Sequence, residues 1–134
     1  MKIALDLLDL QPGETMLELG CGDGRVLVAA AERGWHVVGY ELNPLLALLC
    51  WLRTRKYGDR VEVKCRDFWQ AKWPATEGIY GFILPRLMEK LDKKVVQEYG
   101  TPVKAHVKVV SFAFAIPSKK PVKEQAGVFL YEYK

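Results

Sequence analysis

Hydrophobic and polar positions along the chain follow two periods, one typical of helices and one typical of strands. Apolar side chains recur at helical spacing over residues 3–10, and this pattern stops at Pro12 and Gly13. Beyond them, short apolar or alternating runs take turns with helical segments that end at a glycine. This order predicts an α/β fold in which helices cover both faces of a mostly parallel sheet.

The predicted elements have definite bounds. Helices are expected over residues 3–10, 24–34, 44–58 and 86–100, and strands over 15–20, 35–42, 61–67, 79–85, 105–116 and 128–134. The loop before the last strand is too short for a helical crossover, so this strand should run antiparallel to the others. We expect residues 1–134 to form one compact domain with a Rossmann-like, doubly wound sheet.

Composition and charge narrow the class of protein. Half of the 134 residues are hydrophobic, and no apolar run is long enough for a transmembrane helix. Residues 1–14 predict an amphipathic helix rather than a secretion signal, because Asp6 and Asp9 interrupt the apolar positions. The net charge of +4 comes with lysine clusters that lack interleaved aromatic residues. They predict solvated faces, with a patch for an acidic partner as the alternative, and no nucleic-acid site.

The three cysteines indicate a reducing environment. Cys21, Cys50 and Cys65 are odd in number and show no CxxC spacing. Neither a disulfide framework nor a zinc site is therefore expected. These features lead us to expect a cytoplasmic protein.

Residues 18–24, with the sequence ELGCGDG, join the first predicted strand to its helix. In a parallel sheet, ligands bind beyond the carboxyl ends of the strands. Glycines there allow a tight turn and a close approach to backbone N–H groups, and the helix that begins near Gly24 adds a partial positive charge. A dinucleotide fingerprint would require a glycine at the position of Arg25.

The acid followed by alternating glycines resembles motif I of the class I S-adenosylmethionine-dependent methyltransferases. This resemblance rests on Glu18, Gly20, Gly22 and Gly24 and implies S-adenosylmethionine as the cofactor. Its methionine end carries an ammonium and a sulfonium cation, which Glu18 would face. Cys21 lies in the same loop and is counted among the cofactor-binding residues. It is expected to be a small spacer rather than a nucleophile, because no histidine is near it in sequence.

Two further strand ends carry residues that suit a nucleoside. Glu41 ends the second predicted strand, where a carboxylate accepts hydrogen bonds from both ribose hydroxyls, a feature that would also fit NAD. Leu42 and Asn43 follow it and are expected beside the adenine. The family resemblance implies that Asp67 binds the adenine amino group and that the backbone N–H of Phe68 faces the ring, although a simple turn or helix cap is an alternative role for Asp67.

A closer resemblance covers nearly the whole chain. The chain looks like the small lysine methyltransferases related to the mitochondrial ATP-synthase c-subunit methyltransferase. The stretches that carry this resemblance are residues 19–44, 82–95, 109–122 and 128–133. That family implies N-methylation of a protein lysine, so we expect a protein substrate that carries the target lysine.

The region predicted to bind the methyl acceptor matches the motif of amine-methylating enzymes only in part. Many class I enzymes that methylate amines carry Asp or Asn, two prolines and an aromatic residue after the fourth strand, whereas residues 83–88 retain Pro85 alone. No catalytic residue is assigned for this reason, and Leu84 and Pro85, with Arg86 after them, are predicted to line the acceptor entrance. The alternatives are a small-molecule or nucleic-acid acceptor, a NAD-dependent enzyme, and a non-catalytic scaffold module.

Overall fold

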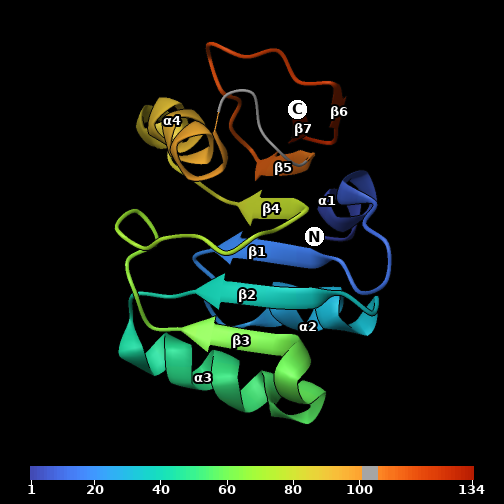
Figure 1. The fold of residues 1–134 in the computed structure, drawn as a ribbon, viewed down its shortest axis with the longest axis vertical. Coiled ribbons are helices and arrows are strands. Elements are labelled where there is room, and N and C mark those ends of the chain that lie inside the picture. Colours follow the sequence, from blue (N-terminus) through green and yellow to red (C-terminus); the bar gives the residue numbers. More distant parts are fainter. Residues whose placement is uncertain (101–105) are drawn as a thin grey trace. The chain divides into compact units, whose positions relative to one another are not determined.

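The computed structural model describes residues 1–100 and 106–134. The chain forms two compact units. Figure 1 labels their helices and strands. We call Leu10–Thr76 the inner unit, and Met1–Asp9 together with Glu77–Lys134 the terminal unit. Ala105, the first residue of one predicted strand, lies outside the described residues.

The inner unit contains a parallel sheet and the helices that connect its strands (Figure 1). Its strands pair in the order β3-β2-β1, with Leu17 opposite Val38 and Val38 opposite Glu62. Because all three strands are parallel, their carboxyl ends lie at the same edge, where the predicted cofactor residues are found. The elements are β1 (Thr15–Leu19), α2 (Arg25–Glu32), β2 (His36–Tyr40), α3 (Pro44–Thr54), the 3₁₀ helix η1 (Arg55–Arg60) and β3 (Val61–Lys64).

Local chemistry explains where α3 begins and ends. The Asn43 side-chain oxygen accepts hydrogen bonds from the N–H groups of Leu45, at 2.9 Å, and Leu46, at 3.4 Å, so Asn43 is the N-cap. The predicted extension of this helix to Gly58 is wrong, because the chain tightens into η1 after Thr54. Gly58 itself has φ 59° and ψ −134°, which no helix contains.

The terminal unit holds the remaining strands, in the order β4-β5-β7-β6. β4 is parallel to β5, whereas β7 is antiparallel to β5, as predicted for the last strand. Its elements are α1 (Lys2–Leu8), β4 (Gly78–Gly81), the 3₁₀ helix η2 (Pro85–Leu87), α4 (Met88–Tyr99), β5 (Val107–Phe112), β6 (Lys123–Gln125) and β7 (Val128–Tyr133).

Two details of this unit differ from the sequence prediction. β5 ends at Phe112 rather than at Ile116, since Ala113 has a positive φ of 75° and breaks the extended backbone. The short strand β6 was not predicted, because its three residues are all polar and exposed and carry no alternating pattern.

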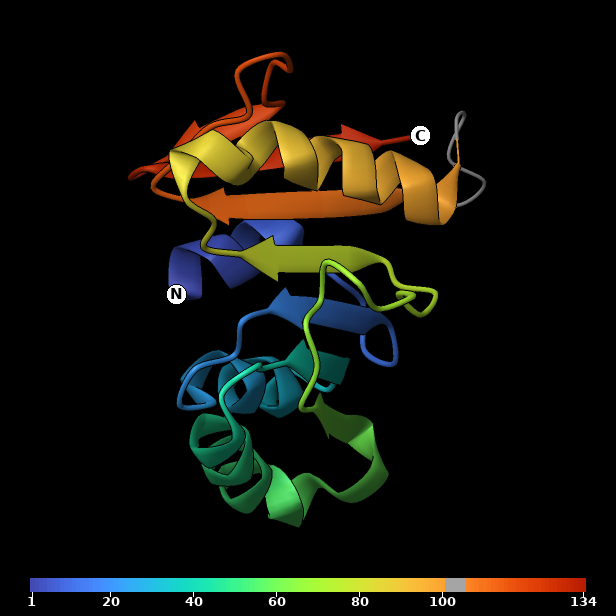
Figure 2. The ribbon, with the colours of Figure 1, turned by 90° about the vertical axis from the view of Figure 1, so that its left-hand side faces the viewer.

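Helices pack against both sides of β5. Figure 1 shows α4 and α1 on opposite sides of this strand, and Figure 2 shows α4 running along it. Met88 and Leu91 of α4 are fully buried, as expected for a helix core. On α1, the Leu8 carbonyl accepts a hydrogen bond from Lys108 Nζ at 2.9 Å. Among the described residues, no helix combines the length and apolar character needed to cross a bilayer.

Candidate functional site

The loop between β1 and α2 is a tight turn whose three glycines have positive φ angles. These angles are 84° at Gly20, 53° at Gly22 and 87° at Gly24. The N–H groups of Gly20 and Cys21 both donate to the Tyr40 carbonyl at 2.9 Å, which fixes the loop to the end of β2. The loop therefore brings the N-terminus of α2 to the carboxyl edge of the sheet, where its N–H groups can face a ligand.

Glu18 is a buried carboxylate at this edge. Its side chain is 3% exposed, and among the described residues its Oε1 is the buried side-chain oxygen that lacks a hydrogen-bond partner. Burial, with the carboxylates of Asp23 and Glu41 adding to it, raises the pKa of Glu18 to about 8. The ionised form of such a buried carboxyl group is stabilised by a cation or a hydrogen-bond donor brought by a ligand.

Glu41 joins the end of β2 to the glycine loop. One carboxylate oxygen accepts from the N–H of Gly22 at 2.8 Å and the other from the N–H of Asn43 at 3.0 Å. The side chain is only partly buried. It is thus held in one orientation by two backbone donors, and each oxygen retains a lone pair for a further donor such as a ribose hydroxyl.

Electrostatics of the loop favour a cationic ligand over a diphosphate. Glu18, Asp23 and Glu41 form an acidic cluster around the glycines, as their mutual influence on the Glu18 pKa shows. Asp23 is held in place by Arg25, whose Nε lies 2.8 Å from a carboxylate oxygen. A diphosphate would be repelled by the carboxylates of Asp23 and Glu41, whereas an ammonium or sulfonium group would be attracted by them and would favour the ionised form of Glu18. The arrangement therefore speaks against the NAD alternative.

Two buried thiols lie beneath the loop. Cys21 Sγ is 3.2 Å from Cys50 Sγ on α3, and Cys50 Sγ donates to the carbonyl of Gly22 at 2.9 Å. Burial is the largest cause that raises the pKa of both thiols. Both side chains pack where they hold the turn against α3, and the interpretation of Cys21 as a spacer stays a prediction.

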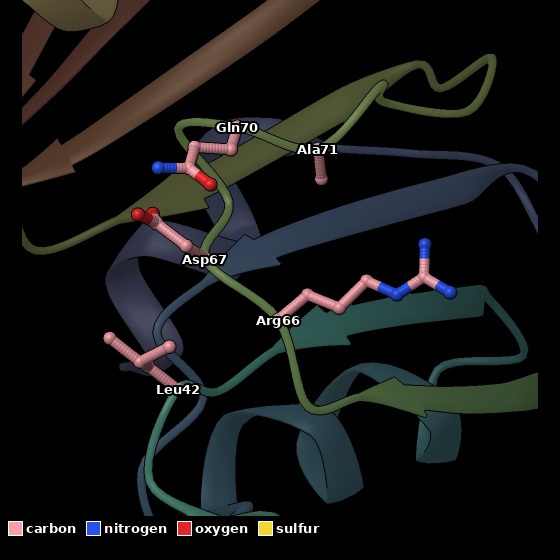
Figure 3. Close-up of a pocket in the computed structure, with 5 residues that line it drawn as sticks. All are labelled: Leu42, Arg66, Asp67, Gln70 and Ala71. Atoms are coloured by element: carbon pink, nitrogen blue, oxygen red, sulfur yellow. The ribbon is translucent and has the colours of Figure 1, made fainter.

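A pocket of about 390 Å³ opens at the end of β3 (Figure 3). Leu42 and Asp67, both predicted beside the adenine, lie in its wall together. Asp67 Oδ1 accepts from the N–H of Trp69 at 3.0 Å, so this carboxylate also stabilises the turn after β3. The full lining consists of Leu42, Arg66, Asp67, Gln70 and Ala71.

Phe68 lies in the same turn, outside this lining. Its ring packs against that of Trp69, with 4.7 Å between centroids. Its carbonyl accepts a hydrogen bond from Trp73 Nε1 at 2.9 Å. The turn is therefore held by aromatic packing, and the role of the Phe68 N–H toward an adenine ring stays a prediction.

The predicted acceptor residues follow β4 in the terminal unit. Leu84 is 46% exposed, and Pro85 opens η2. Beside them, three phenylalanines form a cluster at the carboxyl ends of β4 and β5. The ring of Phe82 lies 5.7 Å from that of Phe112 and 5.9 Å from that of Phe114, measured between centroids.

Several residues of the candidate site were not identified by sequence analysis. Asp23 could have been recognised, since an acid inside a glycine loop lies within reach of the same ligand as Glu18. Cys50, Arg66 and Gln70 carry no such signal, because only the packing of α3 and the turn after β3 brings them to the site. The phenylalanine cluster likewise depends on the pairing of two strands that lie far apart in sequence.

Known proteins resemble this chain over most of its length. Residues 18–123 match the family described as the ANTKMT methyltransferase domain. The chain is 30% identical over 125 residues to the lysine N-methyltransferase of the ATP synthase c-subunit from Xenopus laevis, covering 90% of this chain and 52% of that protein. It is 36% identical over 122 residues to the adenine nucleotide translocase lysine N-methyltransferase of Mus musculus, covering 88% and 51%.

A solved structure supports the same conclusion. The RNA methyltransferase of Salinibacter ruber in complex with S-adenosyl-L-homocysteine is 26% identical, with a TM-score of 0.83 over 98% of this chain and 87% of that one. This likeness confirms the predicted α/β, Rossmann-like methyltransferase fold. The chain spans about half the length of the two lysine methyltransferases that it matches. On the strength of the match over residues 18–123, the chain belongs to the family of the ANTKMT methyltransferase domain.

Proposed function

We propose that this protein binds S-adenosylmethionine and transfers its methyl group to the side-chain amine of a lysine in a protein substrate. The observation that carries the proposal is the buried, unpartnered Oε1 of Glu18 within an acidic cluster at the glycine loop. Such a site takes a ligand that is cationic at one end and has a nucleoside at the other. Relatives named as lysine N-methyltransferases, at 30% and 36% identity, support the choice of acceptor.

The described residues suit the parts of this cofactor. Glu18 would face the ammonium and sulfonium charges, and Glu41 would accept hydrogen bonds from the ribose hydroxyls. The pocket between Leu42 and Asp67 would take the adenine. When bound, the cofactor supplies an activated methyl group, so the protein has only to orient the acceptor and exclude water.

Within the terminal unit, the phenylalanine cluster of Phe82, Phe112 and Phe114, next to Leu84 and Pro85, offers an apolar surface that suits the aliphatic part of a lysine side chain. Phe82 is 56% and Phe112 37% exposed, which leaves ring faces available to a substrate. Phenyl faces pack well against the methylene groups of a lysine side chain. Apolar surroundings also lower the pKa of an amine, which yields the neutral nucleophile that methyl transfer requires.

Two measurements test the proposal. Calorimetric titration should show binding of S-adenosylmethionine and S-adenosylhomocysteine, and NAD should not compete. Incubation of a lysate with the protein and cofactor should yield new methyl-lysine by mass spectrometry. The Glu41→Ala variant should lose this activity, while Glu62→Ala, which removes an exposed acid of β3, should keep it. Binding without any methylated product would instead support the scaffold alternative.

RNA is a second candidate acceptor, because the Salinibacter ruber structure that matches 98% of this chain is named as an RNA methyltransferase. The same lysate experiment separates the two acceptors. Label that survives ribonuclease and is lost with protease indicates protein, and the reverse indicates RNA.

We also propose a reducing, cytoplasmic setting. All three cysteines are free thiols in the structure, and Cys65 is exposed. Fractionation of cells that express the full chain, with detection by antibody, tests this location.

A further inference from the structure

The outward face of α3 is strongly apolar. Leucines at 45, 48 and 52 have the spacing that places side chains on one side of a helix. In most amphipathic helices such a stripe packs into the core, but here it is exposed. The exposed fractions are 77% for Leu45, 52% for Leu48, 51% for Trp51 and 50% for Leu52.

The opposite face of α3 holds the helix to the inner unit. Ala47, Cys50 and Thr54 are its buried residues, and Cys50 contacts the glycine loop through its thiol. The helix is therefore anchored by small side chains, and its large apolar side chains point outward. Leu42, just before the helix, is 66% exposed and extends the apolar surface.

The charged residues within the segment that carries this face are all cationic, while Glu41 and Asp59 flank the segment and Asp23 interacts with Arg53. Residues 42–58 contain no aspartate or glutamate, whereas Arg53, Arg55 and Lys56 follow one another at the end of the helix. All three cationic side chains are exposed. The guanidinium of Arg55 lies over the ring of Trp51, with 4.9 Å to its centroid. Apolar surface, a tryptophan and cations are thus combined on α3 and the adjoining 3₁₀ helix η1.

We propose that α3 docks on the surface of an anionic phospholipid bilayer. Its leucines would enter the boundary between headgroups and acyl chains, Trp51 would lie at the headgroup level, and the cations would contact lipid phosphates. A bilayer supplies both partners that this face requires, a fluid apolar layer and negative charge. A second copy docked through the same face would bring Arg55 and Lys56 against the same cations and no acid of residues 42–58.

The direct test is flotation of the purified protein with vesicles. Binding is expected with vesicles of phosphatidylcholine and phosphatidylglycerol, weaker binding with phosphatidylcholine alone, and a decrease when salt is raised. The double variant Leu45→Gln/Leu48→Gln should reduce the affinity for vesicles by about tenfold or more, because glutamine lacks the apolar surface that each leucine would bury in the bilayer. Arg55→Gln/Lys56→Gln should remove the preference for anionic vesicles.

Matched controls separate this surface from exposed residues in general. Val122→Gln removes an apolar side chain that is 57% exposed in the terminal unit, and it should bind vesicles as the unchanged protein does. Lys120→Gln/Lys123→Gln provides the same control for charge. Circular dichroism and titration with S-adenosylhomocysteine establish that each variant is folded, independently of vesicle binding and of any methyl acceptor.

Tryptophan fluorescence locates the contact. Trp51 is half exposed, Trp35 is 2% and Trp73 4% exposed, and Trp69, of intermediate exposure, lies in the turn after β3 and away from α3's outward face. A vesicle-induced blue shift should therefore disappear in Trp51→Phe and persist in Trp69→Phe. Three results would overturn the proposal: no binding to either vesicle, binding that the leucine variant leaves unchanged, or a dimer in sedimentation velocity that the leucine variant dissociates. The last result would identify a second copy as the occupant of this face.

Discussion

The carboxylate of Glu41, at the end of β2, accepts a hydrogen bond from the N–H of Gly22 in the glycine loop, with 2.8 Å between Oε1 and N. This contact joins the acid predicted for the ribose to the loop predicted for the methionine end. The other oxygen of Glu41 accepts from the N–H of Asn43, at the start of α3. One side chain therefore fixes the relative positions of the loop and the helix that follow two neighbouring strands.

Replacing Glu41 should weaken cofactor binding. In Glu41→Gln the amide nitrogen would face one of two N–H donors, so one charge-assisted hydrogen bond would be lost. We expect the affinity for S-adenosylhomocysteine to fall by about tenfold or more, which corresponds to about 1.4 kcal/mol. Calorimetric titration measures this change. Glu62→Gln, an exposed acid on β3, is the control and should bind normally. Equal affinities of all three proteins would contradict the assigned role.

Glu18 should couple cofactor binding to pH. Its pKa is raised to about 8 from the ordinary 4.5, mainly by burial, so the free protein holds this carboxyl protonated near neutral pH. A cationic ligand favours the ionised form, and binding should release a proton below pH 8. Affinity should therefore increase as the pH rises toward the pKa. Calorimetry in buffers of different ionisation enthalpy counts the released proton.

The same shift sets the sign of the stability profile. Because the folded protein binds a proton that the unfolded chain has lost above pH 4.5, this group's contribution to stability is complete below that pH and is lost as the pH rises through about 8. Urea unfolding of the ligand-free protein should show this fall, and Glu18→Gln should lack it. In the calorimetric experiment the ammonium of the ligand also titrates, both with the unchanged protein and with Glu18→Gln. Only the difference in proton release between these two proteins therefore reports on Glu18. Identical proton release by the two proteins would refute the assignment.

Gly24 should tolerate alanine less well than Gly13. Both glycines have nearly the same backbone angle, φ 87° and 88°, so alanine introduces similar strain at each, about 1–2 kcal/mol. A Cβ at Gly24 would also lie 3.2 Å from Cys50 Cα, whereas none of the described atoms lies within 4 Å of one at Gly13. We expect Gly24→Ala to lower the free energy of unfolding by about 1 kcal/mol more than Gly13→Ala.

The two glycine variants should also differ in function. Gly24 is the N-cap of α2, so a shift there moves the N–H groups of the loop. Only Gly24→Ala should weaken the binding of S-adenosylhomocysteine. Urea denaturation and titration of both proteins provide the comparison, and equal losses in the two variants would mean that backbone strain alone matters at Gly24.

Sequence patterns were sufficient for much of this fold because its elements have local causes. The Asn43 cap and the proline after it identify the start of α3, and the glycine spacing identifies the loop after β1. The ends of elements were less predictable. β5 stops at Phe112 through the backbone conformation of Ala113, a property that no pattern of apolar residues encodes.

The candidate site, like the fold, was predictable from the sequence only in part. Residues at strand ends could be identified individually, since a buried strand that ends in an acid requires a partner for it. Their combination could not be, because the acidic cluster of Glu18, Asp23 and Glu41 depends on where the loop folds back. The exposed leucines of α3 illustrate the reverse case: their helical spacing predicts a buried stripe, and only the structure reveals that it faces outward.

The buried thiols should distinguish the closed loop from an open one. Burial raises the pKa of Cys21 and of Cys50, and both side chains are almost inaccessible, whereas Cys65 is exposed. Because the thiolate is the reactive form, iodoacetamide should modify only Cys65 in the native protein and all three cysteines after unfolding. Mass spectrometry of the intact chain counts the modified thiols, and Cys65→Ser should remove the native reaction. Rapid native modification of Cys21 or Cys50 would mean that the glycine loop opens away from α3, and suppression of that reaction by S-adenosylhomocysteine would show that the cofactor closes it.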